Sequence, residues 1–144
     1  MLGSLSGCEM FSIRRGWVQP ESTHRAPPDH GSEAMALLFQ YGSNMSSARL
    51  NSEARLRGDA KVRCVARTVE PFELVFSVWS TNNNCAAADI VQSKAGRRLY
   101  GVVYEVPDFL VSRETAKPHQ RKSMDSIEGV GTNYVRQTIE IEDR

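Results

Sequence analysis

A period of two dominates the chain after Gly58 and constrains the fold more than any other feature of the sequence. Apolar and polar side chains alternate through residues 61–67 and 72–79, which is typical of strands with one buried face. The predicted buried faces carry Val62, Cys64 and Ala66 in the first segment and Phe72, Leu74, Phe76 and Val78 in the second. Further strands are predicted for residues 35–41, 86–92, 99–106 and 134–142.

Short helical segments are expected between these strands. One runs from Ser46 to Arg57, one begins near Asp108 and is interrupted by Pro118, and one runs from about Arg121 to Glu128. Strands and helices do not alternate regularly, so a parallel sheet built from βαβ units is excluded. We predict an α+β fold, a small mixed or antiparallel β-barrel with flanking short helices.

The pattern divides the chain into two parts. Residues 1–34 contain three prolines, scattered glycines and serines, and no apolar period, which predicts a disordered N-terminal extension. Residues 35–144 are expected to form one domain. A chain of 144 residues is long enough for a real core, since roughly 68–70% of the surface is buried at about 150 residues.

Composition excludes several classes of function. The net charge of +1 provides no field that would attract nucleic acid or an anionic membrane, and no segment has the ~20 consecutive apolar residues of a membrane span. Cys8, Cys64 and Cys85 have no disulfide or metal spacing, and the three histidines have none either. We therefore expect a cytoplasmic protein without a nucleic-acid or membrane partner.

The first predicted strand ends in a turn of small polar residues, Tyr41-Gly42-Ser43-Asn44. Because N–H groups at a helix start have no intrahelical partner, such a turn can bind a carboxylate or a carbonyl oxygen. Gly42 lacks a Cβ and lets a ligand approach the backbone closely. The alternative is that Ser43 and Asn44 only cap the helix.

Glu128 is the candidate acid–base residue. It ends a short helical segment beside Ile127 and Val130. Apolar surroundings disfavour the charged carboxylate and raise its pKa toward neutrality, which suits proton transfer. The helix dipole disfavours a negative charge at the C-terminus of a helix, so it does not explain an acidic residue at this position. The alternative is a solvated glutamate at a helix end.

Four parts of the chain, taken in order, resemble the γ-glutamylcyclotransferase-like (AIG2-like) proteins. They are Leu38-Phe-Gln-Tyr-Gly-Ser-Asn-Met45; Cys64-Val-Ala-Arg67 with Phe72-Glu-Leu-Val-Phe76; Leu99-Tyr-Gly-Val-Val-Tyr-Glu-Val106; and Met124-Asp-Ser-Ile-Glu-Gly-Val130 followed by Tyr134. The resemblance runs from about Ala36 to Ile141. It covers nearly the whole patterned region.

The resemblance implies an enzyme that converts γ-glutamyl amino acids to 5-oxoproline and a free amino acid, with no metal or organic cofactor. The substrate's own α-amine would attack its γ-carbonyl, with Glu128 as proton acceptor and donor. The partner implied is a small γ-glutamyl substrate, and a homodimer is left open. The implied substrate-binding residues are Leu38, Phe39, Gln40, Tyr41, Gly42, Ser43, Asn44 and Tyr134. For Tyr134, a core tyrosine at a strand start is the alternative.

The end of the chain keeps other hypotheses open. The chain stops at Arg144, whereas the proteins it resembles usually continue, so a C-terminally incomplete barrel with an open edge is expected. A non-catalytic ligand-binding or regulatory protein, or a truncated form of the same fold, is the second hypothesis. The third is an enzyme that acts on γ-glutamyl-ε-lysine or glutathione. Ser43 and Asn44 argue against the third, because relatives with those substrates tend to carry other residues after the glycine.

Overall fold

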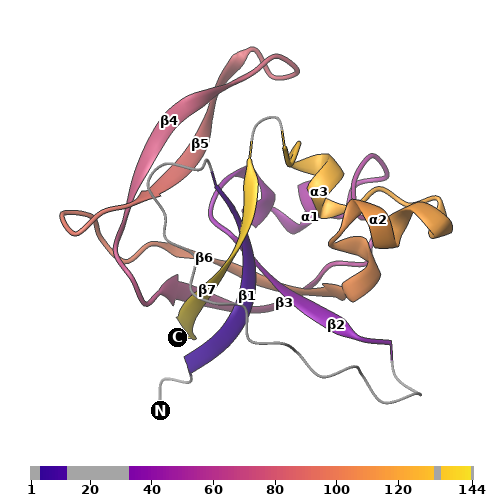
Figure 1. Ribbon diagram of the computed structural model, residues 1–144, viewed down its shortest axis with the longest axis horizontal. Coiled ribbons are helices and arrows are strands. Elements are labelled where there is room, and N and C mark those ends of the chain that lie inside the picture. Colours follow the sequence, from indigo (N-terminus) through magenta and orange to yellow (C-terminus); the bar gives the residue numbers. More distant parts are fainter. Residues whose placement is uncertain (1–3, 13–32, 132–133, 144) are drawn as a thin grey trace.

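Five strands close into a barrel in the order β1-β2-β6-β3-β7 (Figure 1). The protein is known from a computed structural model, which describes residues 4–12, 33–131 and 134–143. The barrel strands are β1 (Ser4–Ser12), β2 (Met35–Gln40), β3 (Lys61–Thr68), β6 (Tyr100–Pro107) and β7 (Val135–Asp143). Strand β1 runs parallel to β2, and all other neighbours in the barrel are antiparallel. The predicted α+β fold with a small mixed barrel is confirmed.

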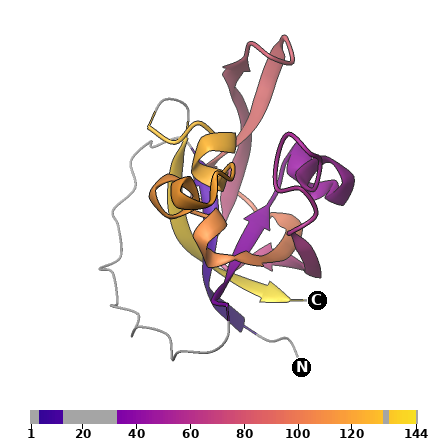
Figure 2. The ribbon, with the colours of Figure 1, turned by 90° about the vertical axis from the view of Figure 1, so that its right-hand side faces the viewer.

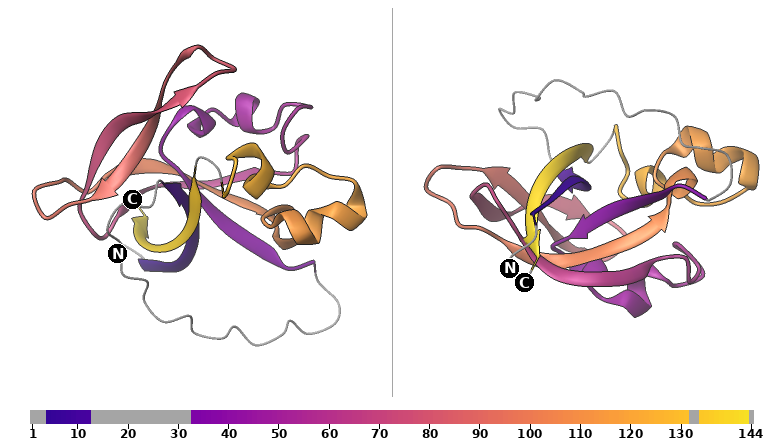
Figure 3. Two further views of the ribbon diagram at one scale, coloured as in Figure 1. Left: turned by 45° about the horizontal axis from the view of Figure 1, so that its top comes forward. Right: turned by 90° about the horizontal axis from the view of Figure 1, so that it is seen from below.

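Strand β1 lies between β2 and β7 and closes the barrel, as the views in Figure 3 show. Its side chains Cys8 and Met10 are fully buried in the core. The prediction of a disordered extension is therefore wrong for residues 4–12, and the described barrel does not have the open edge that was expected. The rest of the predicted extension, apart from residues 33 and 34, lies outside the described residues.

Two physical features hid β1 in the sequence. A register shift between Leu5 and Cys8 interrupts the alternation of the strand. Its pairing partners are also far away in sequence, since Ser12 pairs with Val135 and Glu9 with Leu38. Local sequence propensity carries no information about contacts between residues so far apart in the chain.

Strands β4 (Phe72–Ser80) and β5 (Cys85–Gln92) form a separate two-stranded sheet that extends away from the barrel (Figure 2). Phe72 and Val78 are buried as predicted, but Leu74 and Phe76 are 47% and 63% exposed. The expectation that both are buried is wrong because no second layer from the described residues covers this part of the hairpin. Val62 of β3 is also exposed, since a register shift between Val62 and Cys64 reverses the alternation.

The helical segments are shorter than predicted. They are η1 (Ser43–Met45), α1 (Ser47–Leu50), η2 (Asp108–Leu110), α2 (Arg113–Ala116), η3 (Lys117–His119) and α3 (Met124–Ile127). The helix predicted to reach Arg57 ends at Leu50 because Asn51 turns the chain toward β3. The side chain of Asn51 donates to the Ala60 carbonyl at 2.8 Å and accepts from the Ala60 N–H at 2.9 Å. None of the helices in the described ranges is long and apolar enough to cross a bilayer.

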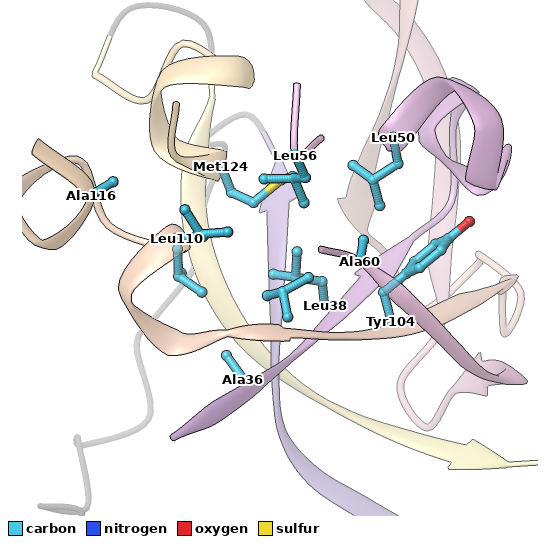
Figure 4. Close-up of a cluster of buried hydrophobic side chains, with 11 residues drawn as sticks. Ala36, Leu38, Leu50, Leu56, Ala60, Tyr104, Leu110, Ala116 and Met124 are labelled. Atoms are coloured by element: carbon cyan, nitrogen blue, oxygen red, sulfur yellow. The ribbon is translucent and has the colours of Figure 1, made fainter. Parts of the chain in front are cut away.

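A buried cluster joins the barrel wall to these segments (Figure 4). Its members are Ala36, Leu38, Leu50, Leu56, Ala60, Tyr104, Val106, Leu110, Val111, Ala116 and Met124. The ring of Tyr104 is buried there, and its hydroxyl donates to the Met45 carbonyl at 2.8 Å. The core therefore fixes the turn that follows β2.

Candidate active site

Three segments far apart in the sequence surround a cavity of about 700 Å³. They are the end of β2 with the turn and α1 region after it, the β4–β5 hairpin, and the end of α3 with Tyr134. In Figure 2 the α1 region and the α3 region stand on either side of the hairpin. The hairpin side of the cavity includes Trp79 and residues 85–88.

The turn after β2 presents unpaired backbone donors. The N–H of Met45 donates to the Gly42 carbonyl at 3.0 Å and that of Ser46 to the Ser43 carbonyl at 3.3 Å, so the turn is closed by its own backbone. The N–H groups of Ser43 and Asn44 donate to no residue in the described part of the chain. Both residues line the cavity, which makes these donors candidates for binding a ligand there.

The α3 segment holds Glu128 at the opposite wall. Ser123 caps this short helix by accepting from the Ser126 N–H at 3.2 Å, and the Glu128 N–H closes it on the Met124 carbonyl at 2.9 Å. Gly129 follows with φ of 64°, a left-handed conformation that favours glycine and ends the helix. The cavity end of α3 is therefore set by local hydrogen bonds.

A buried aspartate anchors α3 to the barrel. The Asp125 carboxylate accepts from Arg136 Nη1 of β7 at 3.1 Å and from the backbone N–H of Arg113 at 3.2 Å. The Asp125 N–H donates to the Val111 carbonyl at 3.1 Å. These contacts join α3 to both β7 and α2, so Asp125 positions Glu128 from three residues away.

Asn44 and Glu128 meet directly. Asn44 Nδ2 donates to Glu128 Oε1 at 2.6 Å, across 84 positions of sequence. Asn44 is only 6% exposed, and its Oδ1 atom is buried without a hydrogen-bond partner in the described ranges. The carboxylate is thus held by one end of the amide, while the acceptor at the other end is buried and has no described partner.

The surroundings of Glu128 shift its proton affinity. Burial raises the pKa of the Glu128 carboxyl above its ordinary value, because the charged form loses solvation. The positive charge of Arg55, the hydrogen bond from Asn44 and the charge of Arg49 oppose this shift, in that order of size. A carboxyl with a raised pKa binds a proton more tightly than an exposed glutamate does, which suits a group that must accept a proton and give it back.

Arg49 and Arg55 line the same cavity and were not among the residues singled out from the sequence. Arg49 belongs to α1, and Arg55 lies in the turn that follows it. Burial and the charge of Arg49 lower the pKa of Arg55, while Glu128 opposes this. No sequence signal distinguished these two arginines from ordinary surface charges on a helical segment.

Of the predicted substrate-binding residues, Leu38 alone does not line the cavity. It is fully buried in the cluster of Figure 4. Those that line the cavity are Phe39, Gln40, Tyr41, Gly42, Ser43, Asn44 and Tyr134, together with Glu128. A Cβ at Gly42 would meet only the Ala88 Cβ, at an ordinary 3.8 Å. Packing against the protein therefore does not demand a glycine there.

Tyr134 connects the two sides of the site. Its hydroxyl donates to the Ala88 carbonyl of β5 at 3.1 Å. Burial and the neighbouring carboxylates of Glu128 and Asp89 raise the pKa of Tyr134 to about 12. The phenol therefore stays protonated near neutrality and serves as a hydrogen-bond donor.

Residues 38–144 match the family described as gamma-glutamyl cyclotransferase, AIG2-like. The chain belongs to this family. Membership of this family indicates a cyclotransferase-type function that acts on small γ-glutamyl substrates. Searches of curated proteins and of solved structures gave no match. Within the described ranges, no group of three His, Cys, Asp or Glu side chains is placed to hold a metal ion.

Proposed function

We propose that this protein is a γ-glutamylcyclotransferase that converts γ-glutamyl amino acids to 5-oxoproline and a free amino acid, with the cytoplasm as its compartment. The contact between Asn44 and Glu128, at 2.6 Å in the wall of one cavity, is the observation that carries the proposal. It places a carboxyl of raised pKa beside a turn with free backbone N–H groups. Cyclisation needs both a base and an oxygen-binding site in one place.

Binding supplies the first part of the mechanism. The N–H groups of Ser43 and Asn44 donate hydrogen bonds to an oxygen of the substrate, either its glutamyl carboxylate or the oxyanion that develops on the γ-carbonyl. The cavity holds the glutamyl chain curled, so that its α-amine lies close to its own γ-carbon. Reactions that are oriented within one molecule in this way reach effective molarities of roughly 10⁵–10⁸ M.

Proton transfer supplies the second part. Glu128 takes a proton from the substrate's α-ammonium group, and the neutral amine attacks the γ-carbonyl carbon. When the tetrahedral intermediate collapses, the new ring C–N bond remains and the old amide C–N bond breaks. The attacking nitrogen loses two protons in all, and the departing nitrogen gains two. Glu128 relays them one after the other, an effect typically worth about 10²–10⁴-fold.

The reaction is tested by its products. We expect the protein to release equal amounts of 5-oxoproline and alanine from γ-glutamyl-alanine. An N-acetylated form of the same dipeptide, which has no free α-amine, should release neither product. Release of glutamate in place of 5-oxoproline would mean hydrolysis and would contradict intramolecular attack.

A further inference from the structure

We propose that Arg49 and Arg55 bind the carboxylate of the departing amino acid, so that the enzyme selects γ-glutamyl amino acids over γ-glutamyl compounds that lack this carboxylate. This inference rests on the proposed cyclotransferase activity and names the feature of the substrate that the cavity recognises.

The charges of the cavity favour such a ligand. Two arginines and one carboxylate, Glu128, carry the formal charges of its lining, a net charge of +1 with Glu128 ionised. A γ-glutamyl amino acid has two carboxylates and one ammonium group, a net charge of −1. The two are complementary, and each proton that Glu128 accepts makes the lining more positive.

The two guanidinium groups have unused donors. Neither Arg49 nor Arg55 forms an ion pair with a residue in the described part of the chain, whereas Arg67, Arg121 and Arg136 do. The Nε atom of Arg49 is buried and has no described hydrogen-bond partner. The Arg49 side chain as a whole is half-buried and lines the cavity, so a carboxylate bound there would pair with its other donors.

The cavity offers two groups of hydrogen-bond donors, one for each carboxylate of the substrate. The free N–H groups of Ser43 and Asn44 form one anion-binding group, beside the base. The arginine pair forms a second group, on α1 and the turn after it. Both arginines line the same cavity as Glu128, the group that must protonate the departing nitrogen. The carboxylate of the departing amino acid is only two bonds away from that nitrogen.

Three ligands test the two carboxylates of the substrate one at a time. They are γ-glutamyl-alanine, the same dipeptide with its alanine carboxylate converted to an amide, and the same dipeptide with its glutamyl carboxylate converted to an amide. The kcat/KM for each is measured with the parent protein and with Arg49→Gln and Arg55→Gln. Arg57→Gln is the matched control, because Arg57 lies in the same turn, is exposed and does not line the cavity. Calorimetric Kd values are measured in parallel in a Glu128→Gln background, where chemistry is blocked.

We expect the parent protein to prefer γ-glutamyl-alanine over the alanine amide by about 10- to 100-fold, the worth of a charge-assisted hydrogen bond or two. Arg49→Gln and Arg55→Gln should bring this ratio toward one, in Kd as in kcat/KM, and Arg57→Gln should leave it in place. If the arginines only tuned Glu128 or stabilised the fold, the substitutions would lower kcat/KM equally for all three ligands. The preference for γ-glutamyl-alanine over the alanine amide would then stay unchanged, and this result would overturn the proposal. The proposal is also overturned if the arginine substitutions abolish the preference for γ-glutamyl-alanine over the glutamyl amide and not over the alanine amide. If the parent protein releases no 5-oxoproline, the proposed function is refuted, and the Kd ratios still test whether the arginines bind the carboxylate. If none of the ligands binds, both the proposed function and this inference are refuted.

Discussion

Replacing Asn44 by leucine removes the link between the turn and Glu128 at nearly constant side-chain size. The substitution deletes the 2.6 Å hydrogen bond from Nδ2 to the Glu128 carboxylate. It also deletes the buried Oδ1 acceptor, which has no described partner. We expect the two losses to act in opposite directions on stability, and the loss of the hydrogen bond to Glu128 to lower the rate of catalysis.

The magnitudes follow from the burial of Asn44, which is 6% exposed. A hydrogen bond to a charged group contributes about 1.5–3 kcal/mol, and a buried group left without a partner costs about 1–3 kcal/mol. These terms nearly cancel, so the free energy of unfolding should change by less than about 2 kcal/mol. For catalysis, the loss of about 1.5–3 kcal/mol corresponds to a decrease in kcat/KM of roughly 10- to 100-fold at neutral pH.

The pH dependence gives the prediction its sign. The Asn44 hydrogen bond lowers the pKa of Glu128 and so opposes the effect of burial. Without it the pKa of Glu128 rises further, and the carboxylate form that accepts the first proton requires a higher pH. The acidic limb of the kcat/KM profile should therefore move to higher pH in Asn44→Leu.

The assay is the pH profile of 5-oxoproline release, together with urea unfolding of each variant. Asn51→Leu is the control, because the Asn51 side chain binds the Ala60 backbone outside the cavity lining. It should lower stability and leave the acidic limb in place. An Asn44→Leu profile that matches the parent in position and height would refute the reasoning.

Three further predictions concern the fold and the charge of Glu128. Met10→Ala should lower the free energy of unfolding by about 2–5 kcal/mol, because Met10 of β1 is fully buried; a change within experimental error would show that β1 does not belong to the barrel. Gly101→Ala should cost more than about 1 kcal/mol, since its Cβ would lie 2.5 Å from the Gln40 carbonyl oxygen, and unchanged urea unfolding would contradict that close approach. The raised pKa of Glu128 means that the native state keeps its proton longer than the unfolded state, so stability falls as the pH rises through the native pKa. Glu128→Gln should remove this part of the fall, and a stability profile identical to the parent's would count against a raised pKa.

Local patterns of apolar residues predicted most of the barrel strands, because a buried strand leaves a mark in its own sequence. Residues 61–67 became β3, and residues 99–106 became β6 with a shift of one position. The prediction failed where a distant contact decides the outcome. β1 is a strand because it pairs with β2 and β7, and Phe76 is exposed because no described residue covers that part of β4.

Local pattern made the turn and Glu128 candidates with common alternatives, and the resemblance decided in favour of a site. Ser43, Asn44 and Glu128 have common alternatives as helix caps and surface charges, and only the fold shows that Asn44 and Glu128 touch across 84 positions. Leu38 belongs to the core because alternate residues of β2 point to opposite faces, and Phe39 lines the cavity instead. Arg49 and Arg55 escaped notice because charges on a short helical segment are usually solvated.

The central claim is that the Glu128 carboxyl transfers the protons of the cyclisation. Its most direct test is 5-oxoproline release from γ-glutamyl-alanine by Glu128→Gln, compared with the parent protein at equal concentration and with circular dichroism as proof of folding. Because glutamine keeps the shape of the side chain and cannot carry a proton, the rate should fall by at least about 10²-fold while the spectrum is unchanged. A folded Glu128→Gln protein that releases 5-oxoproline at the parent rate would contradict the account.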